Sequence, residues 1–380
     1  MRILHTADWH LGRIFHGIHL TDDQAYVLEQ FVQLAGDVKP DVIVIAGDVY
    51  DRAVPPTDAV KLLNEVISRI ILDCKIPVLL IAGNHDSPER LGFGTRLLAR
   101  QGLFISGQPG DNLAPIILQD AYGPVYFCAI PYTEPSVIRE ALAVPEAADH
   151  NSSMLSLLKH CTASIPRGSR TVAVAHAYVA GGESSESERP LTIGGTGMVD
   201  ASCFQSFNYV ALGHLHKPQK TGDGMCYAGS LLKYSFSESS HQKSINFVEM
   251  DEAGNITLDK ITLSPRRDVR CLEGYIKDIL AGPKNGESKE DYIMVTLKDT
   301  GAILDAIGKL REVYPNVLHI ERPPLLDGGE IHGPRDDHRQ ISDMDLFSSF
   351  FEQVAGVPLT GEEARTFAET VDLFYPKEQR

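Results

Sequence analysis

Blocks of apolar and polar residues alternate over the first part of the chain. Val42–Ala46 and Val78–Ala82 are short unbroken apolar runs, typical of buried strands, and Ile3–Ala7 is a similar run. Between them, Thr21–Ala35 carries apolar residues at helical spacing. Thr57 can cap a helix whose apolar residues recur every three or four positions: Val60, Leu63, Ile67 and Ile70. This β-α-β-α-β order predicts an α/β layer.

The middle of the chain contains more expected strands than helices. Val125–Ile130 and Thr171–Ala175 are expected strands, with a helix at Ser152–Cys161 between them. Ala180–Gly197 is rich in Gly, Ser and Glu and is predicted to be a long exposed loop. Four more strands follow, the last two joined by a turn at 251–255: Tyr209–Leu212, Met225–Ala228, Ile245–Met250 and Ile256–Leu263. This run of strands predicts a second sheet packed on the first.

A change in composition at Ser264-Pro265-Arg266-Arg267 ends the main domain, which we place at residues 1–264. A small α+β domain is predicted over residues 265–324, with strands at Asp291–Leu297 and Val317–Glu321 and a helix at Ala302–Val313. Residues 325–341 are polar and contain Gly, Pro and Asp, so we expect a linker there.

The tail, residues 342–375, is predicted to be helical. Its first helix starts at Ser342 and ends before Gly356 and Pro358, and a capping box at residues 360–363 opens the second. Apolar residues gather on one face of each helix: Leu346, Phe347, Phe350, Phe351 and Val354, then Phe367, Val371 and Phe374. Two such short helices cannot bury these side chains alone. Either they pack back on the main body, or they dock on helices of a partner.

Composition limits the classes of protein that fit this pattern. Hydrophobic residues make up 43% of the 380 residues and charged residues 23%, which is ordinary for a globular protein with a large core. No stretch approaches the roughly 18 apolar residues of a membrane span, and the N-terminus lacks the apolar core of a signal peptide. The cysteines are scattered, which predicts reduced core residues in a cytoplasmic protein: Cys74, Cys128, Cys161, Cys203, Cys226 and Cys271.

The formal net charge of −16 is unusual for a protein that binds nucleic acid alone, because such proteins usually carry a basic excess. Two interpretations remain open. Either the substrate is small, or nucleic acid is held by local basic patches, metal ions and a partner protein.

Five polar segments each lie at or just after an expected strand end, where α/β proteins place their sites: Asp8-Trp9-His10, Gly47-Asp48, Gly83-Asn84-His85-Asp86, His176 and Gly213-His214-Leu215-His216. Singly, most have a structural explanation. Asp48 could cap a turn, Asn84 could form one, and His176 could be a core histidine. Gly-His-x-His is more informative, since alternate residues of an extended segment project the same way.

Together, these segments predict a metal centre. They supply carboxylate and amide oxygens and imidazole nitrogens but no thiolate, a set that suits Mn²⁺ especially, with Mg²⁺, Fe²⁺ or Zn²⁺ as alternatives. Seven ligands are too many for one ion: Asp8, His10, Asp48, Asn84, His176, His214 and His216. Two ions about 3.5–4 Å apart account for them. Asp48 is the expected bridge, because its strand lies between the others in order.

As an ordered series, these segments resemble the signature of calcineurin-like metallophosphoesterases, and the series spans Asp8 to His216. Four stretches narrow the resemblance to the bacterial SbcD family of nuclease subunits: residues 5–12 (HTADWHLG), 47–51 (GDVYD), 211–216 (ALGHLH) and 227–230 (YAGS). The resemblance implies an α/β/β/α fold of two packed mixed sheets flanked by helices. It also implies a small capping domain and C-terminal helices.

The resemblance also implies residue roles. Asp8, His10 and His216 would hold one ion, Asn84, His176 and His214 the other, and Asp48 would bridge them. His85 would face the scissile phosphate and stabilise the transition state or protonate the leaving oxygen. Asp51 would orient His85 or a metal ligand. Four basic residues near the site loops could contact DNA phosphates, or could be ordinary surface charges: Arg13, Arg52, Arg90 and Lys233.

The implied function is DNA end processing, repair and recombination with the SMC-like ATPase SbcC, in the cytoplasm and associated with the nucleoid. The family's activities are an ATP-dependent 3′-to-5′ exonuclease on duplex DNA and an endonuclease on single strands and hairpins. The family assembles as a nuclease homodimer with two ATPases. The resemblance implies that the interface of the homodimer would lie on helices 57–72 and 88–101. The tail would dock SbcC through six apolar residues: Leu346, Phe347, Phe350, Phe351, Phe367 and Val371.

Two alternatives belong to other classes. One is a metallophosphatase or small-nucleotide phosphodiesterase with the same metal core, which the acidic charge favours. The other is a non-catalytic adaptor, which the presence of all seven ligands and His85 argues against.

Overall fold

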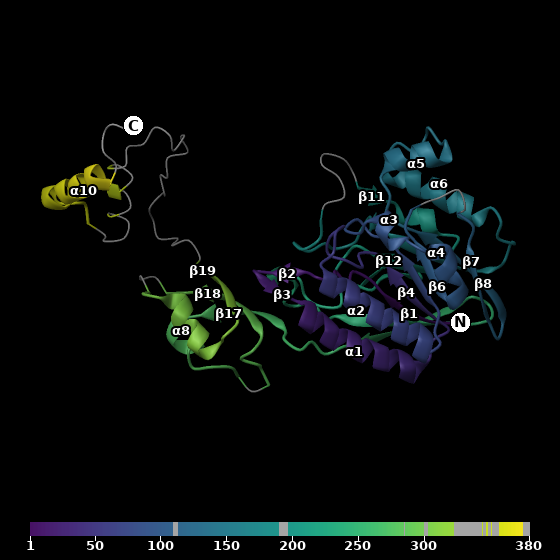
Figure 1. The fold of residues 1–380 in the computed structure, drawn as a ribbon, viewed down its shortest axis with the longest axis horizontal. Coiled ribbons are helices and arrows are strands. Elements are labelled where there is room, and N and C mark those ends of the chain that lie inside the picture. Colours follow the sequence, from purple (N-terminus) through teal and green to yellow (C-terminus); the bar gives the residue numbers. More distant parts are fainter. Residues whose placement is uncertain are drawn as a thin grey trace.

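The computed structural model describes residues 1–108, 113–189, 197–284, 286–299, 303–322, 344, 347–348, 351 and 357–374. The main body consists of two six-stranded sheets with helices on their outer faces (Figure 1). A three-stranded domain follows, and then the C-terminal helix α10 (Gly361–Phe374). No helix within these ranges is long and apolar enough to cross a membrane.

The first sheet has the order β16-β15-β1-β4-β5-β6. Its strands are β16 (Ile256–Thr262), β15 (Ser244–Met250), β1 (Arg2–Thr6), β4 (Val42–Ala46), β5 (Val78–Ile81) and β6 (Leu103–Ser106). The run from β1 to β6 is parallel, whereas β15 and β16 add an antiparallel edge beside β1. The sequence predicted a second sheet from the later strands, but β15 and β16 complete the first, because the apolar side chains of β15 fill the core beside β1.

The second sheet has the order β13-β14-β12-β9-β8-β7. Its strands are β13 (Gln219–Gly222), β14 (Met225–Tyr227), β12 (Tyr209–Gly213), β9 (Arg170–His176), β8 (Gly123–Ile130) and β7 (Ile116–Asp120). The inner strands β14, β12, β9 and β8 are parallel. A shared core between the two sheets includes Ile3, Val44 and Ile81 from one sheet and Phe127 and Val174 from the other.

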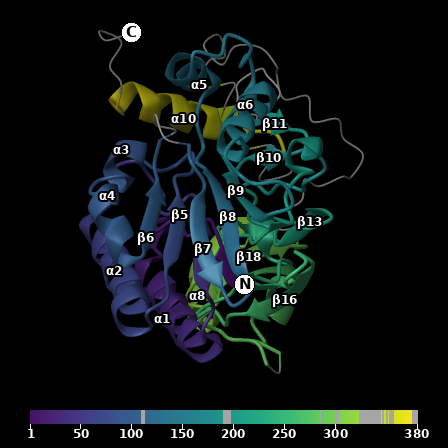
Figure 2. The same cartoon turned by 90° about the vertical axis from the view of Figure 1, so that its right-hand side faces the viewer.

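Helices cover both outer faces. The first sheet is covered by α1 (Thr21–Val38) and α2 (Thr57–Ser68), which η1 (Arg69–Asp73) extends (Figure 2). Three short helices come next along the chain: α3 (Pro88–Leu91), α4 (Thr95–Leu98) and η2 (Ala99–Gln101). On the second, α5 (Pro135–Leu142) and α6 (His150–Thr162) pack against the sheet. These layers confirm the predicted α/β/β/α fold. Thr57 is not the cap of α2, because the N-cap is Pro56 and no side chain caps this end.

Short elements complete the body. A two-stranded ribbon, β2 (Ile14–Phe15) and β3 (Ile18–His19), projects from the loop after β1, and β10 (Tyr178–Val179) pairs with β11 (Met198–Val199). Two 3-10 turns, η3 (Ala201–Phe204) and η4 (Phe236–Glu238), precede β12 and β15. The turn η4 packs against the first strand of the following domain.

The small domain is a three-stranded parallel sheet with two helices. It contains β17 (Val269–Gly274), α7 (Ile276–Ile279), β18 (Tyr292–Leu297), α8 (Ala306–Val313) and β19 (Val317–Glu321). Its apolar residues form a separate core that includes Ile293, Val295, Leu297 and Leu310. The predicted linker 325–341 lies outside the described residues.

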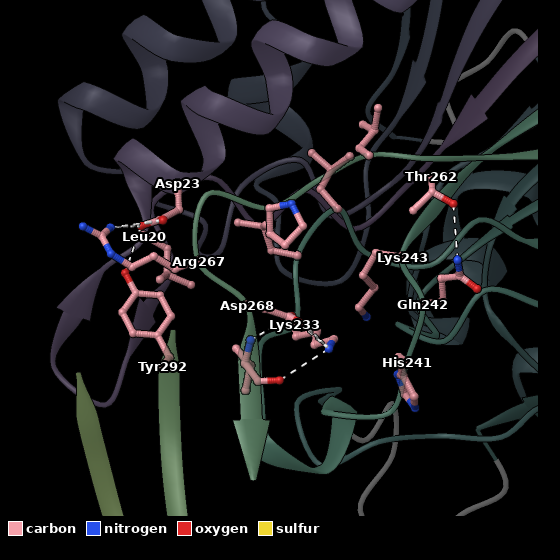
Figure 3. Close-up of a pocket in the computed structure, with 15 residues that line it drawn as sticks. Leu20, Asp23, Lys233, His241, Gln242, Lys243, Thr262, Arg267, Asp268 and Tyr292 are labelled. Atoms are coloured by element: carbon pink, nitrogen blue, oxygen red, sulfur yellow. Dashed lines mark hydrogen bonds and ion pairs between the residues drawn. The ribbon is translucent and has the colours of Figure 1, made fainter. Parts of the chain in front are cut away.

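Polar contacts fasten this domain to the body around a cavity of about 160 Å³ (Figure 3). Arg267 Nη1 lies 3.2 Å from Asp23 Oδ1 on α1, and the Tyr292 hydroxyl donates to Asp23 Oδ2 at 2.9 Å. The ammonium of Lys233 lies 2.9 Å from Asp268 Oδ1. Two separate sets of contacts among the residues that line the cavity therefore attach the domain to the body.

Candidate metal centre

The five polar segments converge at one edge, where strands of both sheets end. Asp8, Asp48 and Asn84 follow β1, β4 and β5, whereas His176 ends β9 and His214 follows β12. Because these strands run parallel within each sheet, their carboxyl ends meet at the same edge. The acidic and imidazole groups gathered there are buried: Asp8, His10, Asp48, His85, His176, His214 and His216.

Several residues of the centre have a left-handed backbone, which residues other than glycine rarely adopt. The φ angle is 53° at Asp8, 45° at His10, 49° at Asp48 and 104° at His214. Two backbone hydrogen bonds hold the bends, from Asp8 N to Gly47 O at 3.0 Å and from His10 N to Asp48 O at 2.9 Å. Such residues cost about 1–3 kcal/mol each and persist where the surrounding structure fixes them, which is typical of functional sites.

Glycine is required beside the ligands because the segments approach closely. A Cβ atom on Gly83 would lie 2.1 Å from Asp48 Oδ1, and one on Gly213 would lie 1.9 Å from Ala46 O. Neither the backbone oxygen of Ala46 nor the buried carboxylate of Asp48 can shift without a large cost in free energy. Gly83 therefore allows the loops after β4 and β5 to meet, and Gly213 allows the second sheet to approach the first at the centre.

The first group of ligand atoms comes from Asp8, His10 and His216, which lie within 4.8 Å of one another. His10 Nε2 faces His216 Nε2 at 3.0 Å. Metal–nitrogen bonds of about 2.0–2.1 Å place neighbouring ligands of one ion about 3 Å apart, so this spacing fits a shared ion. The carboxylate of Asp8 is held by His214 N, which donates to its two oxygens at 2.9 and 3.1 Å.

The second group comes from Asp48, His176 and His214, again within 4.8 Å. Asn84 Oδ1 joins it, at 2.9 Å from His176 Nε2 and 3.2 Å from His214 Nδ1. His176 Nδ1 lies 2.9 Å from Ala46 O. A carbonyl only accepts, so Nδ1 carries a hydrogen and Nε2 is the ring nitrogen that faces the centre.

Asp48 lies between the two groups. Its Oδ2 atom is 3.6 Å from His10 Nε2 and 3.4 Å from His176 Nε2. Its Oδ1 atom accepts a hydrogen bond from His85 N at 2.8 Å, which fixes the carboxylate. This is the position that a bridging ligand needs. The structure thus brings all seven predicted ligands together.

The electrostatics of the centre fit cations. Burial lowers the pKa of His10, His214 and His216, so these rings are neutral near pH 7 and keep a lone pair for a ligand. Burial also raises the pKa of Asp8. Oxygen and neutral nitrogen donors of this kind suit divalent metal ions.

The buried carboxylates lack a permanent counter-charge. Among the described residues, the ion-pair partners of Asp8 and Asp48 are histidines rather than Lys or Arg. Burial alone would lower the pKa of His176, but the charges of Asp48 and Asp8 raise it to about 9. The proton on His176 is therefore the local positive charge, which a divalent ion can replace.

His85 stands beside the ligands, with its ring 4.7 Å from that of His10 and perpendicular to it at 88°. Its Nδ1 atom lies 2.8 Å from the carbonyl oxygen of Asp51. The main chain of Asp51 therefore orients His85, whereas the carboxylate turns to Arg13 Nη1 at 2.8 Å and His10 Nδ1 at 3.6 Å. Burial would raise the pKa of Asp51, but these contacts lower it to about 2.

Two supports were missed at the level of sequence. Asp86, in the segment Gly-Asn-His-Asp, accepts hydrogen bonds from the backbone of Val49, Tyr50 and Gly83 at 2.9–3.1 Å and so joins two of the site loops. Ser187 lies in the predicted exposed loop 180–197 but is only 8% exposed, and its hydroxyl bonds His216. Residues 190–196 of that loop lie outside the described ranges.

The predicted DNA contacts differ in their surroundings. Arg13 pairs with Asp51 at the centre, and Arg52 is exposed next to it in sequence. Arg90 lines an apolar groove beside α2. Lys233 is only 10% exposed in its side chain and bonds Ser239 O, Asp268 and Val269 O, which argues against a DNA contact (Figure 3).

A further cation near the centre escaped sequence analysis. Arg189 is exposed and follows the residues that contact His216. Burial chiefly lowers the pKa of His85, and the charge of Arg189 adds to this effect. A cation in the predicted loop is thus close enough to act on His85.

The tail is described in part. Leu346 and Phe350 lie outside the described residues, whereas Phe347 and Phe367 stack with ring centres 3.8 Å apart and Phe351 lies 6.1 Å from Phe347. The predicted capping box is present, with Thr360 N donating to Glu363 Oε2 at 2.9 Å and Glu363 N donating to Thr360 Oγ1 at 3.4 Å. The two tail segments therefore pack on each other.

Two family models match the sequence of this chain. Residues 1–218 match the model of the calcineurin-like phosphoesterase family. Residues 265–355 match a second family described as the type 5 capsule protein repressor C-terminal domain, abbreviated SbcD_C. Among solved structures, a dimetal phosphatase from Danio rerio aligns with 70% of this chain and 99% of its own, at 13% identity and a TM-score of 0.41.

Two curated relatives cover most of the chain. A protein of Staphylococcus saprophyticus subsp. saprophyticus is 34% identical over 366 residues, which is 96% of each chain. One from Staphylococcus epidermidis is 35% identical over 319 residues, which is 84% of each. Both relatives are named as the SbcD component of the nuclease SbcCD.

Proposed function

The chain belongs to the SbcD family of calcineurin-like phosphoesterases, and we propose that it is a Mn²⁺-dependent DNA nuclease that works with an SbcC-like ATPase. The position of Asp48 carries the proposal. Its Oδ2 atom lies within 3.6 Å of a histidine from each ligand group, as a carboxylate shared by two ions must. In DNA end processing, repair and recombination, such a centre would act as a 3′-to-5′ exonuclease on duplex ends and as an endonuclease on single strands and hairpins.

Each ligand group would hold one ion. Asp8, His10 and His216 would hold one, and Asn84, His176 and His214 the other, with Asp48 shared. When bound, such ions supply Lewis-acid activation of water and neutralise charge on the phosphate. Burial keeps the imidazoles of His10, His214 and His216 neutral, which leaves their lone pairs available for this purpose.

His85 would move the proton. Its Nδ1–H donates to the carbonyl of Asp51, so its Nε2 atom is free to exchange a proton with the substrate. The perpendicular contact with His10 sets the position of the ring beside the ligands. In the protonated form, His85 would give its Nε2 proton to the leaving oxygen.

DNA would be held locally, since the net charge of −16 opposes long-range attraction. Arg52 and Arg189 are exposed near the centre, and Arg13 could leave Asp51 to meet a phosphate. Each would bind the backbone rather than a base, which makes binding sensitive to salt but not to sequence.

The tail would dock the partner. Phe347 stacks on Phe367, and together with Phe351 they line a hollow of about 590 Å³. The rest of the lining is Leu359, three threonines and two glutamates, and aromatic side chains beside polar ones suit the helices of a coiled coil. Replacing Phe367 with Asp should abolish co-purification with the ATPase and leave Mn²⁺ binding intact. Retained co-purification would assign the docking to another surface.

A homodimer would form through the groove beside α2. This groove has a volume of about 610 Å³ and is lined by Leu63, Ile67 and Ile71, and Phe93 near its rim is 84% exposed. A contiguous apolar surface of this size is typical of interfaces. Leu63→Asp should yield monomers in sedimentation, and an unchanged dimer would remove α2 from the interface.

The proposed activity is tested with end-labelled duplex DNA, a hairpin and a small chromogenic diester, each assayed with Mn²⁺ or EDTA. DNA cleavage that needs Mn²⁺ and rises with the ATPase and ATP supports the nuclease. Turnover of the small diester without DNA cleavage in any condition would favour the alternative small-molecule phosphodiesterase.

A further inference from the structure

His216 is held by a chain of buried polar groups on the side away from the proposed ion. Its Nδ1 atom lies 2.6 Å from Ser187 Oγ, and Ser187 Oγ lies 2.5 Å from Glu238 Oε1. Glu238 is fully buried, on the turn η4, and its Oε1 atom lies 3.4 Å from the same nitrogen of His216. Three segments far apart in sequence thus meet behind one ligand.

The directions of the hydrogen bonds between Glu238, Ser187 and His216 follow from which groups can donate. A carboxylate only accepts, so the Ser187 hydroxyl donates to Glu238. The oxygen of Ser187 then accepts from Nδ1–H of His216. This fixes the hydrogen on Nδ1 and leaves the lone pair of Nε2 facing His10, 3.0 Å away.

The carboxylate of Glu238 is itself fixed. The buried ammonium of Lys243 pairs with its Oε2 atom and also donates to His216 O at 2.7 Å and to Ser230 Oγ at 2.8 Å. These contacts use all three hydrogens of Lys243, so the ammonium has none left for a ligand of the neighbouring cavity. Lys243 lines that cavity (Figure 3), but its ammonium is bound to the residues around the histidine.

The backbone of His216 is held from the same loop as Ser187. Glu188 Oε1 accepts from His216 N at 2.7 Å, while the carbonyl of His216 accepts from Lys243. The main chain and the ring of this histidine are thus fixed by residues outside its own segment. The other ligand rings have different partners: His176 Nδ1 bonds a backbone carbonyl, and His10 Nδ1 lies 3.6 Å from the Asp51 carboxylate.

We propose that Ser187 and Glu238 are positioning residues for His216, which set its tautomer and ring orientation for one of the two ions. The inference rests on the proposed two-metal function. Outer partners of metal-bound histidines typically change metal affinity by about 10–100-fold when removed. Loss of the hydrogen bonds that join His216, Ser187 and Glu238 should lower the affinity for the ion held by His216. The ion held by His176 and His214 should keep its affinity.

The test measures Mn²⁺ binding by the full chain with calorimetry and electron paramagnetic resonance. The melting temperature of each protein is measured in EDTA, so that stability is compared without bound metal. Ser187→Ala removes the hydroxyl between His216 and Glu238 but keeps the ion pair of Glu238 with Lys243. Glu238→Gln is a second variant that keeps the shape and removes the charge. Ser153→Ala is the matched control, because it removes another buried hydroxyl, one with no hydrogen bond among the described residues.

The expected result is one ion weakened about 10–100-fold in Ser187→Ala and Glu238→Gln, the other unchanged, and wild-type binding in Ser153→Ala. Unchanged affinity for both ions in folded variants would overturn the inference and leave the nuclease proposal standing. Equal weakening of both ions, or a matching fall in the EDTA melting temperature, would assign Ser187 a structural role only. A wild-type chain that binds no Mn²⁺ would overturn both proposals.

Discussion

His10 Nε2 lies 3.0 Å from His216 Nε2, although the two residues are 206 positions apart and follow strands of different sheets. Burial keeps both rings neutral, so each can offer a ring nitrogen to a shared cation. Where no ion lies between them, Nε2–H of His10 can donate to Nε2 of His216. The fold therefore brings its two sheets together at a point whose nitrogens suit a metal ion.

His85 should matter for chemistry but not for metal binding. Its ring contacts His10, and its hydrogen-bond partner is the carbonyl of Asp51 rather than a ligand. His85→Gln should lower kcat for DNA cleavage by about 10²–10⁴-fold, because a positioned proton donor is lost. KM and Mn²⁺ affinity should stay at wild-type values in steady-state kinetics and calorimetry. The exposed His160 supplies the control, His160→Gln.

The loop cation Arg189 should contribute to DNA binding. Arg189→Ala should raise KM for duplex DNA and reduce the slope of log affinity against log salt by about one, because one phosphate contact is lost. The measurement is fluorescence anisotropy over a salt series. Arg167, exposed before β9 at the end opposite His176, provides the control Arg167→Ala. Equal slopes for all three proteins would exclude Arg189 from the DNA interface.

Gly213 should tolerate no side chain. A Cβ atom there would lie 1.9 Å from Ala46 O and 3.0 Å from His176 Nδ1. Gly213→Ala should destabilise the fold by about 1–3 kcal/mol or more and displace His214, so thermal melting and Mn²⁺ affinity should both fall. Gly361→Ala, where the added carbon meets nothing within 4 Å, should leave both unchanged.

A buried ion pair should make stability depend on acid pH. Arg170 Nη2 lies 2.6 Å from Asp120 Oδ1, and this contact holds the pKa of Asp120 below its ordinary value. A carboxylate with a lowered folded pKa stabilises the fold fully above its unfolded pKa of about 3.9, and the contribution is lost as pH falls toward the folded pKa. Asp120→Asn should therefore cost about 3–5 kcal/mol at pH 7 and less below about pH 4.

Chemical denaturation of both proteins at several pH values measures this difference. The exposed pair of Lys220 and Asp223 is the control, and Asp223→Asn should change stability by less than about 1 kcal/mol at any pH. A constant gap between wild type and Asp120→Asn down to about pH 3 would contradict the assigned ion pair.

The ligands could be predicted from sequence because each follows a strand that is itself recognisable as an apolar run. Asp48 after Val42–Ala46 is the clearest case. Ser187 and Glu238 could not, since they lie 29 and 22 positions from His216 in segments without periodicity. Strand β17 was also missed, because the charged residues Arg270 and Glu273 interrupt its apolar residues.

Side-chain surroundings explain the remaining differences. Lys233 follows the site loops in sequence, but its ammonium turns toward Asp268 and the small domain. The carboxylate of Asp51 was expected to orient His85 or a metal ligand; it lies 3.6 Å from Nδ1 of the ligand His10, whereas the main-chain carbonyl of the same residue bonds His85. Sequence position places a residue near a site, whereas packing decides which of its atoms acts.

The most direct test is the number of Mn²⁺ ions bound per chain, with electron paramagnetic resonance to detect coupling between them. The wild-type chain should bind two ions that are magnetically coupled, since one carboxylate lies between both ligand groups. Asp48→Asn should lose the coupling and weaken both ions. A wild type that binds a single ion, or an Asp48→Asn variant that keeps a coupled pair, would contradict the bridging role of Asp48.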